Sequence, residues 1–140
     1  MKPISDLAEC LRTMNPVLNP GTYVFASVTP GVRIEPEFVL ASIREPEGLS
    51  VVMNEADAEG RNLKSLLRCA WITLSVNSDL QSVGLTAAFA TALGNAGISC
   101  NVIAGACHDH IFVPVHLAEK AMGELRSLQE SVQGARRVHS

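Results

Sequence analysis

The sequence of 140 residues predicts an α+β fold, and three observations support this prediction. Stretches rich in β-branched and aromatic residues alternate with stretches in which apolar residues recur every three or four positions. Hydrophobic residues make up 47% of the chain and Asp, Glu, Lys and Arg only 18%, a composition that excludes intrinsic disorder. The length suits one domain, or two very small ones that share a core.

The first half is expected to contain one short helix followed by strands. Ser5 can cap the helix, and Asn15-Pro16 ends it because the residue before a proline is pushed out of helical geometry. Glu45-Pro46-Glu47-Gly48 suits the joint of a hairpin. The expected elements are a helix at 6–14, strands at 22–28, 38–44 and 49–53, a loop at 29–37, and a short turn of helix within 54–61.

The second half shows clearer periodicity. The expected elements are a strand at 71–76, a helix at 82–95, strands at 98–103 and 108–113, and a final amphipathic helix from Leu117 to Val132. A β-α-β crossover is right-handed, and the order β-α-β-β-α is the plan of a ferredoxin-like half-sandwich. The strand at 22–28 echoes the strand at 71–76, so the first half is compatible with a second, degenerate copy.

Charge is nearly absent from the middle of the second half. Between Arg68 and Asp109, Asp79 is the only Asp, Glu, Lys or Arg residue, so the helix at 82–95 has no charged face. The face opposite its apolar stripe carries small residues, namely Thr86, Ala87, Ala90, Thr91 and Gly94. We expect this face to pack against another subunit or half-domain, although an alanine-rich helix that is merely poor in charge is the alternative.

Composition disfavours several function classes. The formal net charge of -3 does not help nucleic-acid binding, and no apolar run is long enough to span a membrane. Asp6 stands where a secretion signal would have its apolar centre, so we expect a cytoplasmic protein. The four cysteines have no Cys-x-x-Cys spacing and are interpreted as reduced thiols. No nucleophile elbow, Walker loop or dinucleotide fingerprint is present, so no enzyme activity and no cofactor is expected.

The start of the helix at 82–95 is the first candidate site. The first turn of a helix presents unpaired N–H groups and the positive end of its dipole, which stabilise a carboxylate or phosphate. Gly84 has no side chain to keep a ligand away, Gln81 and Ser82 add polar groups, and Asp79 could receive an ammonium group. These residues would suit an amino acid. The alternative is that Asp79 or Ser82 only caps the helix.

A second candidate site is the run His108-Asp109-His110. In a strand, His108 and His110 share one face, and two histidines could begin a metal site. The third ligand would be His116, Cys107 or Cys100, but the spacing matches no known zinc pattern, so no metal is expected. Hydrogen bonds to loop carbonyls or a subunit contact are the favoured roles, and Asp109 could meet a cationic ligand group.

Several segments of the chain resemble ACT domains, the small regulatory modules that bind amino acids. The whole chain from about Pro3 to Val132 resembles bacterial small proteins made of two fused ACT-like units, and the tandem plan is similar to that of the CASTOR arginine sensors. The segments that carry the resemblance are 19–25, 43–52, 83–87, 96–103 and, as the most specific part, His108-Asp109-His110-Ile111-Phe112-Val113-Pro114.

The resemblance implies two fused βαββαβ units at 1–64 and 65–132, with a flexible tail at 133–140, packed into one continuous sheet and often dimeric. It implies a ligand at the seam between the units. Many ACT loops read Asp-x-Pro-Gly, whereas this chain has Val83 before Gly84. The residues implied to contact the ligand are Asn77, Asp79, Gln81, Ser82, Val83, Gly84 and Leu85, facing Ala104, Gly105, Asp109 and His110.

The resulting expectation is a non-catalytic sensor or regulator that binds a small molecule, with an amino acid as the favoured ligand, and forms a homodimer. One alternative is a purely structural oligomerisation domain. The other is a metal-binding protein or enzyme that uses His108 and His110.

Overall fold

The computed structural model describes residues 7–75 and 84–139, with side chains up to residue 132. The chain divides into two compact units, one formed by residues 20–70 and the other by residues 1–19 together with 71–140. The first residues of the chain therefore belong with its C-terminal half, whereas the resemblance implied domains at 1–64 and 65–132. The physical reason is that the first helix packs on helices of that half.

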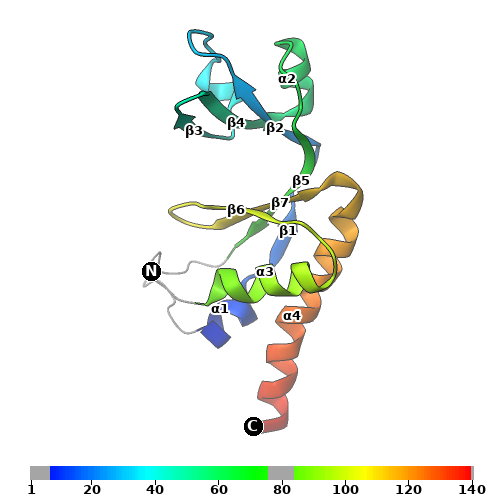
Figure 1. The fold of residues 1–140 in the computed structure, drawn as a ribbon. Coiled ribbons are helices and arrows are strands. Elements are labelled where there is room, and N and C mark those ends of the chain that lie inside the picture. The colour runs from blue at the N-terminus through cyan, green and yellow to red at the C-terminus, as the bar shows by residue number, and fades with distance from the viewer. Residues whose placement is uncertain (1–6, 76–83, 140) are drawn as a thin grey trace. The chain divides into compact units, whose positions relative to one another are not determined.

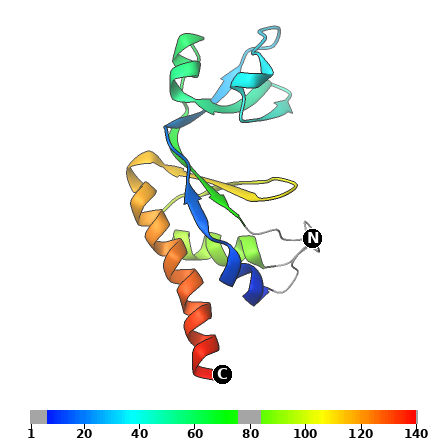
Figure 2. The same cartoon turned by 180° about the vertical axis from the view of Figure 1, so that it is seen from behind.

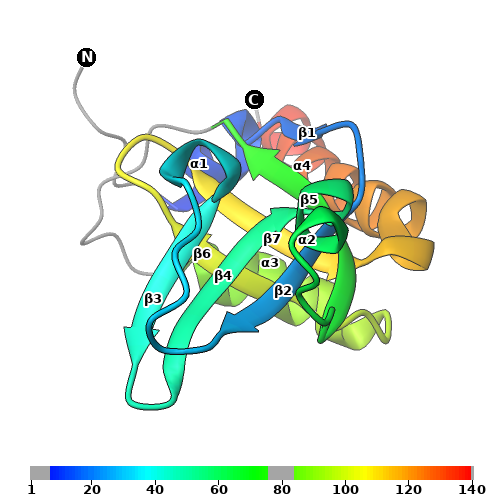
Figure 3. The same ribbon diagram turned by 90° about the horizontal axis from the view of Figure 1, so that it is seen from above.

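The unit of residues 20–70 is a four-stranded antiparallel sheet with short helical segments. Its elements are β2 (Tyr23–Val28), the 3-10 helix η1 (Pro36–Phe38), β3 (Ala41–Glu45), β4 (Gly48–Asn54), α2 (Glu55–Gly60) and the start of β5 (Leu67–Leu74). The strand order is β3-β4-β2-β5 (Figure 3). Glu45 pairs with Gly48, which confirms the predicted hairpin. The predicted strand at 38–44 begins only at Ala41, because η1 occupies the residues up to Phe38.

The core of this unit is a cluster of small and β-branched residues on one face of the sheet. Its buried members are Val24, Ala26, Val28, Val51, Met53 and Ala58. The alternation in β2, where Val24, Ala26 and Val28 are buried, is the period of two that a half-buried strand requires.

The second unit combines a four-stranded sheet with three α-helices on one of its faces (Figures 1 and 2). Its elements are α1 (Leu7–Thr13), β1 (Pro16–Leu18), the end of β5, α3 (Leu85–Asn95), β6 (Asn101–Ala104), β7 (Asp109–Pro114), the 3-10 helix η2 (Val115–Leu117) and α4 (Ala118–His139). The strand order is β1-β5-β7-β6. Ile72, Leu74, Phe89 and Leu93 are fully buried, as the predicted faces of β5 and α3 require.

Several element boundaries differ from those that we predicted. Strand β1 was not expected, because three residues are too short a pattern to detect. It exists because Pro16, Val17 and Leu18 pair with the end of β5. Strand β6 starts three residues later than predicted, because Gly97 has a φ of 77° and the N–H of Ile98 bonds back to the carbonyl of Leu93. Helix α4 continues to His139, into the segment predicted to be a tail.

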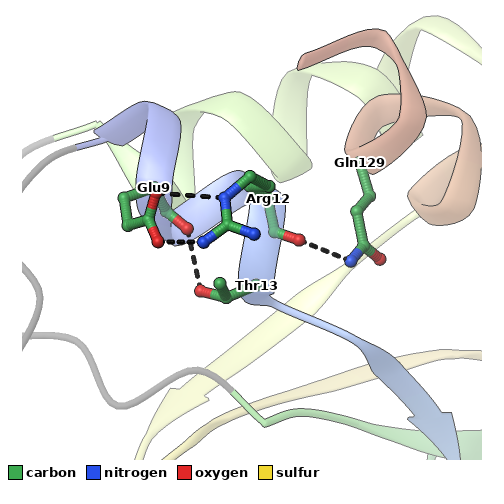
Figure 4. Close-up of polar contacts among 4 residues, drawn as sticks. All are labelled: Glu9, Arg12, Thr13 and Gln129. Carbon is green, nitrogen blue, oxygen red and sulfur yellow. Dashed lines mark hydrogen bonds and ion pairs between the residues drawn. The ribbon is translucent and has the colours of Figure 1, made fainter. Parts of the chain in front are cut away.

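Helix α1 is fixed to the rest of its unit by buried side chains and by a capping contact. Cys10, Leu11 and Met14 are buried. The Gln129 amide of α4 donates to the carbonyl of Arg12 at 2.6 Å and to Oδ1 of Asn15 at 2.8 Å (Figure 4 shows the first contact). These bonds satisfy a carbonyl that the end of α1 leaves without a helical partner. Among the described helices, none is long and apolar enough to cross a membrane.

Candidate functional site

Three segments of the second unit meet at one end of its sheet. They are the end of β5, the start of α3 and the turn between β6 and β7 (Figures 1 and 2). Of the predicted site residues, Asn77, Asp79, Gln81, Ser82 and Val83 lie outside the described residues. The others, Gly84, Leu85, Ala104, Gly105, Asp109 and His110, belong to the described segments at this end of the sheet.

Helix α3 begins without a capping side chain on its N-cap residue. Gly84 is the N-cap, with a left-handed φ of 104°, and its carbonyl accepts from the N–H of Ala88 at 2.9 Å. The N–H groups of residues 85–87 therefore precede the first helical hydrogen bond. A Cβ on Gly84 would lie 3.2 Å from Cδ2 of Leu7, so α1 provides an apolar wall beside the helix start.

Asp109 is the buried charged residue of the described core, with 9% of its surface exposed. It begins β7 and is paired with Ala104. Burial raises the pKa of Asp109, and the neighbouring His110 lowers it. Within residues 7–75 and 84–139 its carboxylate has neither a hydrogen-bond nor an ion-pair partner. No buried side-chain oxygen of the described residues lacks a partner, so the carboxylate oxygens reach solvent, where a cationic ligand group can approach them.

His110 lies in a hydrogen-bonded cluster on the other face of the strands. The Trp71 indole Nε1 donates to His110 Nδ1 at 3.0 Å, with the two ring centroids 5.8 Å apart. Thr73 Oγ1 is 3.4 Å from the same nitrogen. Asn19 Nδ2 donates to Thr73 Oγ1 at 2.9 Å and to the carbonyl of Trp71 at 3.2 Å. Burial, followed by the charge of His108, lowers the pKa of His110, whereas Asp109 raises it.

This cluster was not foreseen from the sequence. We favoured hydrogen bonds from the histidines to loop carbonyls, and a core position for Trp71. Trp71 is only half-buried and binds His110, whereas His108 is exposed and precedes the strand. Trp71 and His110 are 39 positions apart, so no local sequence pattern could predict their hydrogen bond.

The described residues contain no group of three or more His, Cys, Asp and Glu side chains that could hold a metal ion. Cys100, one of the candidate third ligands, is half-buried, and burial raises its pKa to about 11. The same effect raises the pKa of Cys69 to about 11. Burial therefore favours the protonated form of both thiols, which is not the nucleophilic form.

Two family models match the chain in tandem, and both describe the ACT domain. The first covers residues 2–70 and the second residues 66–127. No curated protein matches the chain.

Solved structures extend this result. A protein of unknown function from Vibrio cholerae, described as a possible transport protein, is 43% identical, with a TM-score of 0.78; the match covers 88% of this chain and 95% of that one. An Agrobacterium tumefaciens protein is 18% identical, with a TM-score of 0.63 and coverage of 81% and 87%. The ligand-free regulatory subunit of aspartate kinase from Thermus thermophilus is 10% identical, with a TM-score of 0.60 and coverage of 83% and 97%. The last two show likeness of fold alone.

Proposed function

Because the chain belongs to the ACT-domain family, we propose that it is a non-catalytic regulatory protein that binds an amino acid. The observation that carries the proposal is Asp109, a residue with 9% of its surface exposed whose carboxylate reaches solvent without a partner among the described residues, at the end of the sheet where α3 starts. The likeness to a regulatory subunit of aspartate kinase, an enzyme that acts on an amino acid, supports the same role.

In the proposed site, the two charged groups of the ligand meet opposite charges. The α-carboxylate lies at the N–H groups that begin α3, beside the apolar wall of Leu7. The α-ammonium lies at Asp109 and forms an ion pair with its carboxylate. The placement of the ligand at the seam between two ACT units stays a prediction.

Binding would act on the protein by fixing the relative positions of α3 and the β6–β7 turn. A ligand shifts a conformational equilibrium only by the difference between its affinities for the two states. A ligand that touches both segments has such a difference, because it favours the state in which they lie at the correct separation. A partner that binds only this ligand-bound state would then be regulated by the ligand.

A thermal-shift screen against the twenty amino acids tests the proposal. A ligand at 100 times its dissociation constant adds about 2.7 kcal/mol of stability, which raises the melting temperature of a small protein by several degrees. Asp109→Asn should abolish the shift, whereas the same chemical change at Asp57→Asn, in α2, should leave it unchanged. A flat screen at millimolar amino acid, with the folded protein verified by circular dichroism, would contradict the proposal.

We further propose that the partner is a second copy of the chain, docked on the uncharged face of α3. Thr86, Ala87, Thr91 and Gly94 are exposed on this face, and none is charged. Small side chains allow two helices to approach closely, and no charge has to be buried when they do so. Ala87→Glu should convert the dimer to a monomer in light scattering, whereas Glu119→Gln, on α4, should not. A dimer that survives Ala87→Glu would place the interface elsewhere.

A further inference from the structure

Strand β3 forms one edge of the sheet and is largely exposed. In the described part of the chain the strand order ends at β3, with β4 as its neighbour (Figure 3). Residues 42–45 of this strand are exposed, and Ile43 keeps 66% of its surface accessible. An edge strand presents N–H and C=O groups that its own sheet does not use, and another strand can pair with them.

The ladder with β4 determines which backbone groups of β3 face outward. The N–H of Leu40 donates to the carbonyl of Val52 at 2.8 Å, so Val52 directs its backbone groups toward β3. Backbone groups alternate between the two sides of a strand, so Ser50, two positions earlier, also directs its groups toward β3. Ile43 is the partner of Ser50 and uses its own groups in this ladder. The residues on either side of Ile43 therefore direct their N–H and C=O groups away from β4.

The two outward-facing residues, Ser42 and Arg44, allow few two-fold registers with a second copy of β3. A register that pairs Arg44 with Arg44 would place two like charges opposite each other, which destabilises a sheet. A register that pairs Ser42 with Ser42 would join only residues 41–43 of each strand. A register that pairs Ser42 with Arg44 joins all 5 residues of each strand, and the two-fold axis repeats this hydrogen-bonded pair. This last register is therefore favoured.

The favoured register places Ile43 opposite Ile43 of the second copy. This central pair is not hydrogen-bonded, so its Cα atoms lie about 4.5 Å apart and its side chains are close. The contact covers two apolar side chains that are exposed in the single chain, and such β-branched pairs stabilise a sheet. No like charges meet, because Glu45 lies opposite Ala41 and accepts a hydrogen bond from Ser50 of its own hairpin.

We propose that β3 is a self-association surface, which pairs in an antiparallel ladder with β3 of a second copy about a two-fold axis at Ile43. The surface is separate from the α3 contact, because β3 belongs to residues 20–70 and α3 to the other unit. It also does not depend on binding of an amino acid. Two short strands bury less than the roughly 1,200 Å² of a standard interface, so this contact forms in concentrated solution and not in dilute solution.

Disulfide trapping tests the register. Cys107→Ser, which removes the exposed native cysteine, is the background. In this background Ile43→Cys should form a disulfide-linked dimer on mild oxidation, because Cα atoms about 4.5 Å apart suit a disulfide. The matched control is Arg44→Cys, an exposed position on the same strand whose partner is Ser42 and not itself; it should cross-link several-fold more slowly. Equal rates at the two positions would overturn the proposed register.

A proline substitution separates backbone pairing from random collision. Ser42→Pro removes an outward N–H that the ladder with β4 does not use, so the hairpin should still fold. Trapping through Ile43→Cys should then be lost, with an unchanged melting temperature as the check on folding. Trapping that persists in the folded Ser42→Pro protein would show that no β ladder forms. If Ser42→Pro does not fold, the comparison of Ile43→Cys with Arg44→Cys decides.

Sedimentation velocity provides a second test, in the Ala87→Glu chain. This chain should be monomeric in dilute solution and associate in concentrated solution. Adding Ile43→Lys should abolish the association, because two like charges would then meet at the axis. Adding Leu66→Lys, at a side chain of matching exposure (67%) in the same unit, should leave it unchanged. Equal behaviour of the two lysine variants would refute the proposal. If Ala87→Glu alone stays a dimer in dilute solution, the α3 interface is wrong, and trapping still decides the role of β3.

Discussion

The two units of this protein have the same strand order but very different helices. In residues 20–70 the sheet runs β3-β4-β2-β5, and in the other unit it runs β6-β7-β5-β1. In each, a central strand (β2 or β5) lies between the second strand of a hairpin and a fourth strand, which is the last strand of residues 20–70 but the first strand, β1, of the other unit. The helix that follows the central strand is the three-residue η1 in one unit and the eleven-residue α3 in the other, and the helix that follows the hairpin is the six-residue α2 in one and the 22-residue α4 in the other.

The difference shows that strand order does not require full-length helices. In residues 20–70, partly buried side chains from loops, η1 and β4 pack against the core of the sheet, namely Ile34, Phe38, Val39, Leu49 and Leu63. A three-residue 3-10 helix cannot direct several unpaired N–H groups at one ligand, whereas α3 can. The candidate site therefore belongs to the unit that contains the full-length helix α3.

The largest expected effect compares two phenylalanines, one in η1 and one in α3, the helical segments that follow the central strand of each unit. Phe89 of α3 is fully buried, and Phe38 of η1 is half-buried against the Arg61 guanidinium, 3.9 Å from the ring centroid. Phe89→Ala should cost about 3–5 kcal/mol of unfolding free energy, and Phe38→Ala about 2 kcal/mol. Urea denaturation measures both. Equal losses would show that η1 contributes as much as the full helix.

The next comparison uses two glycines, one that precedes η1 and one that precedes α3. Gly31 has a φ of 89°, and a Cβ added there would meet no atom within 4 Å, whereas Gly84 has a φ of 104° with Leu7 close by. Gly31→Ala should cost about 1 kcal/mol through the left-handed backbone alone. Gly84→Ala should cost about 2 kcal/mol, because a crowded contact is added, and it alone should weaken amino-acid binding. If both variants bind the ligand normally, Gly84 is not part of the site.

Lowering the pH through about 6.5 should reduce the stability of only the unit that contains the histidines. The folded-state pKa of His110 is lowered from its ordinary value of 6.5, so the unfolded chain takes up the proton first as the pH falls. The stability that the neutral ring provides is present above about 6.5 and is lost progressively below it. Melting curves across this range should show the loss in the wild type and less of it in His110→Gln. An identical pH dependence in both would assign it to other groups.

The smallest effect is expected from the ion pair between Glu55 and Arg68 in residues 20–70. Arg68 Nη2 donates to Glu55 Oε1 at 3.1 Å, and this contact lowers the pKa of Glu55. The pair is exposed to solvent, so salt screens it and the side chains lose entropy in forming it. Glu55→Gln should change the melting temperature less than Gly31→Ala does, and only at low salt. A larger change, persisting in high salt, would show that the pair organises the start of β5.

Local patterns were enough to predict most of the elements. The turn at 45–48 and the apolar face of α3 depend on residues a few positions apart and were predicted in the correct place, whereas β5, predicted at 71–76, begins four residues earlier, at Leu67. The resemblance to ACT domains was confirmed for the same reason, because its motifs are short segments whose residue types reflect local geometry. The prediction of Gly84 and Asp109 as site residues used the same local information, and it remains to be tested by binding.

What depends on distant residues was decided by the tertiary structure alone. Strand β1 exists because three residues near the start of the chain pair with β5, more than fifty positions away. The Trp71 indole donates to Nδ1 of His110 across 39 positions of the chain. The Gln129 amide donates to the carbonyl of Arg12 at the end of α1 across 117 positions. A hydrogen bond between such residues leaves no periodic trace in the sequence, since its geometry is set only when the helices and strands have packed.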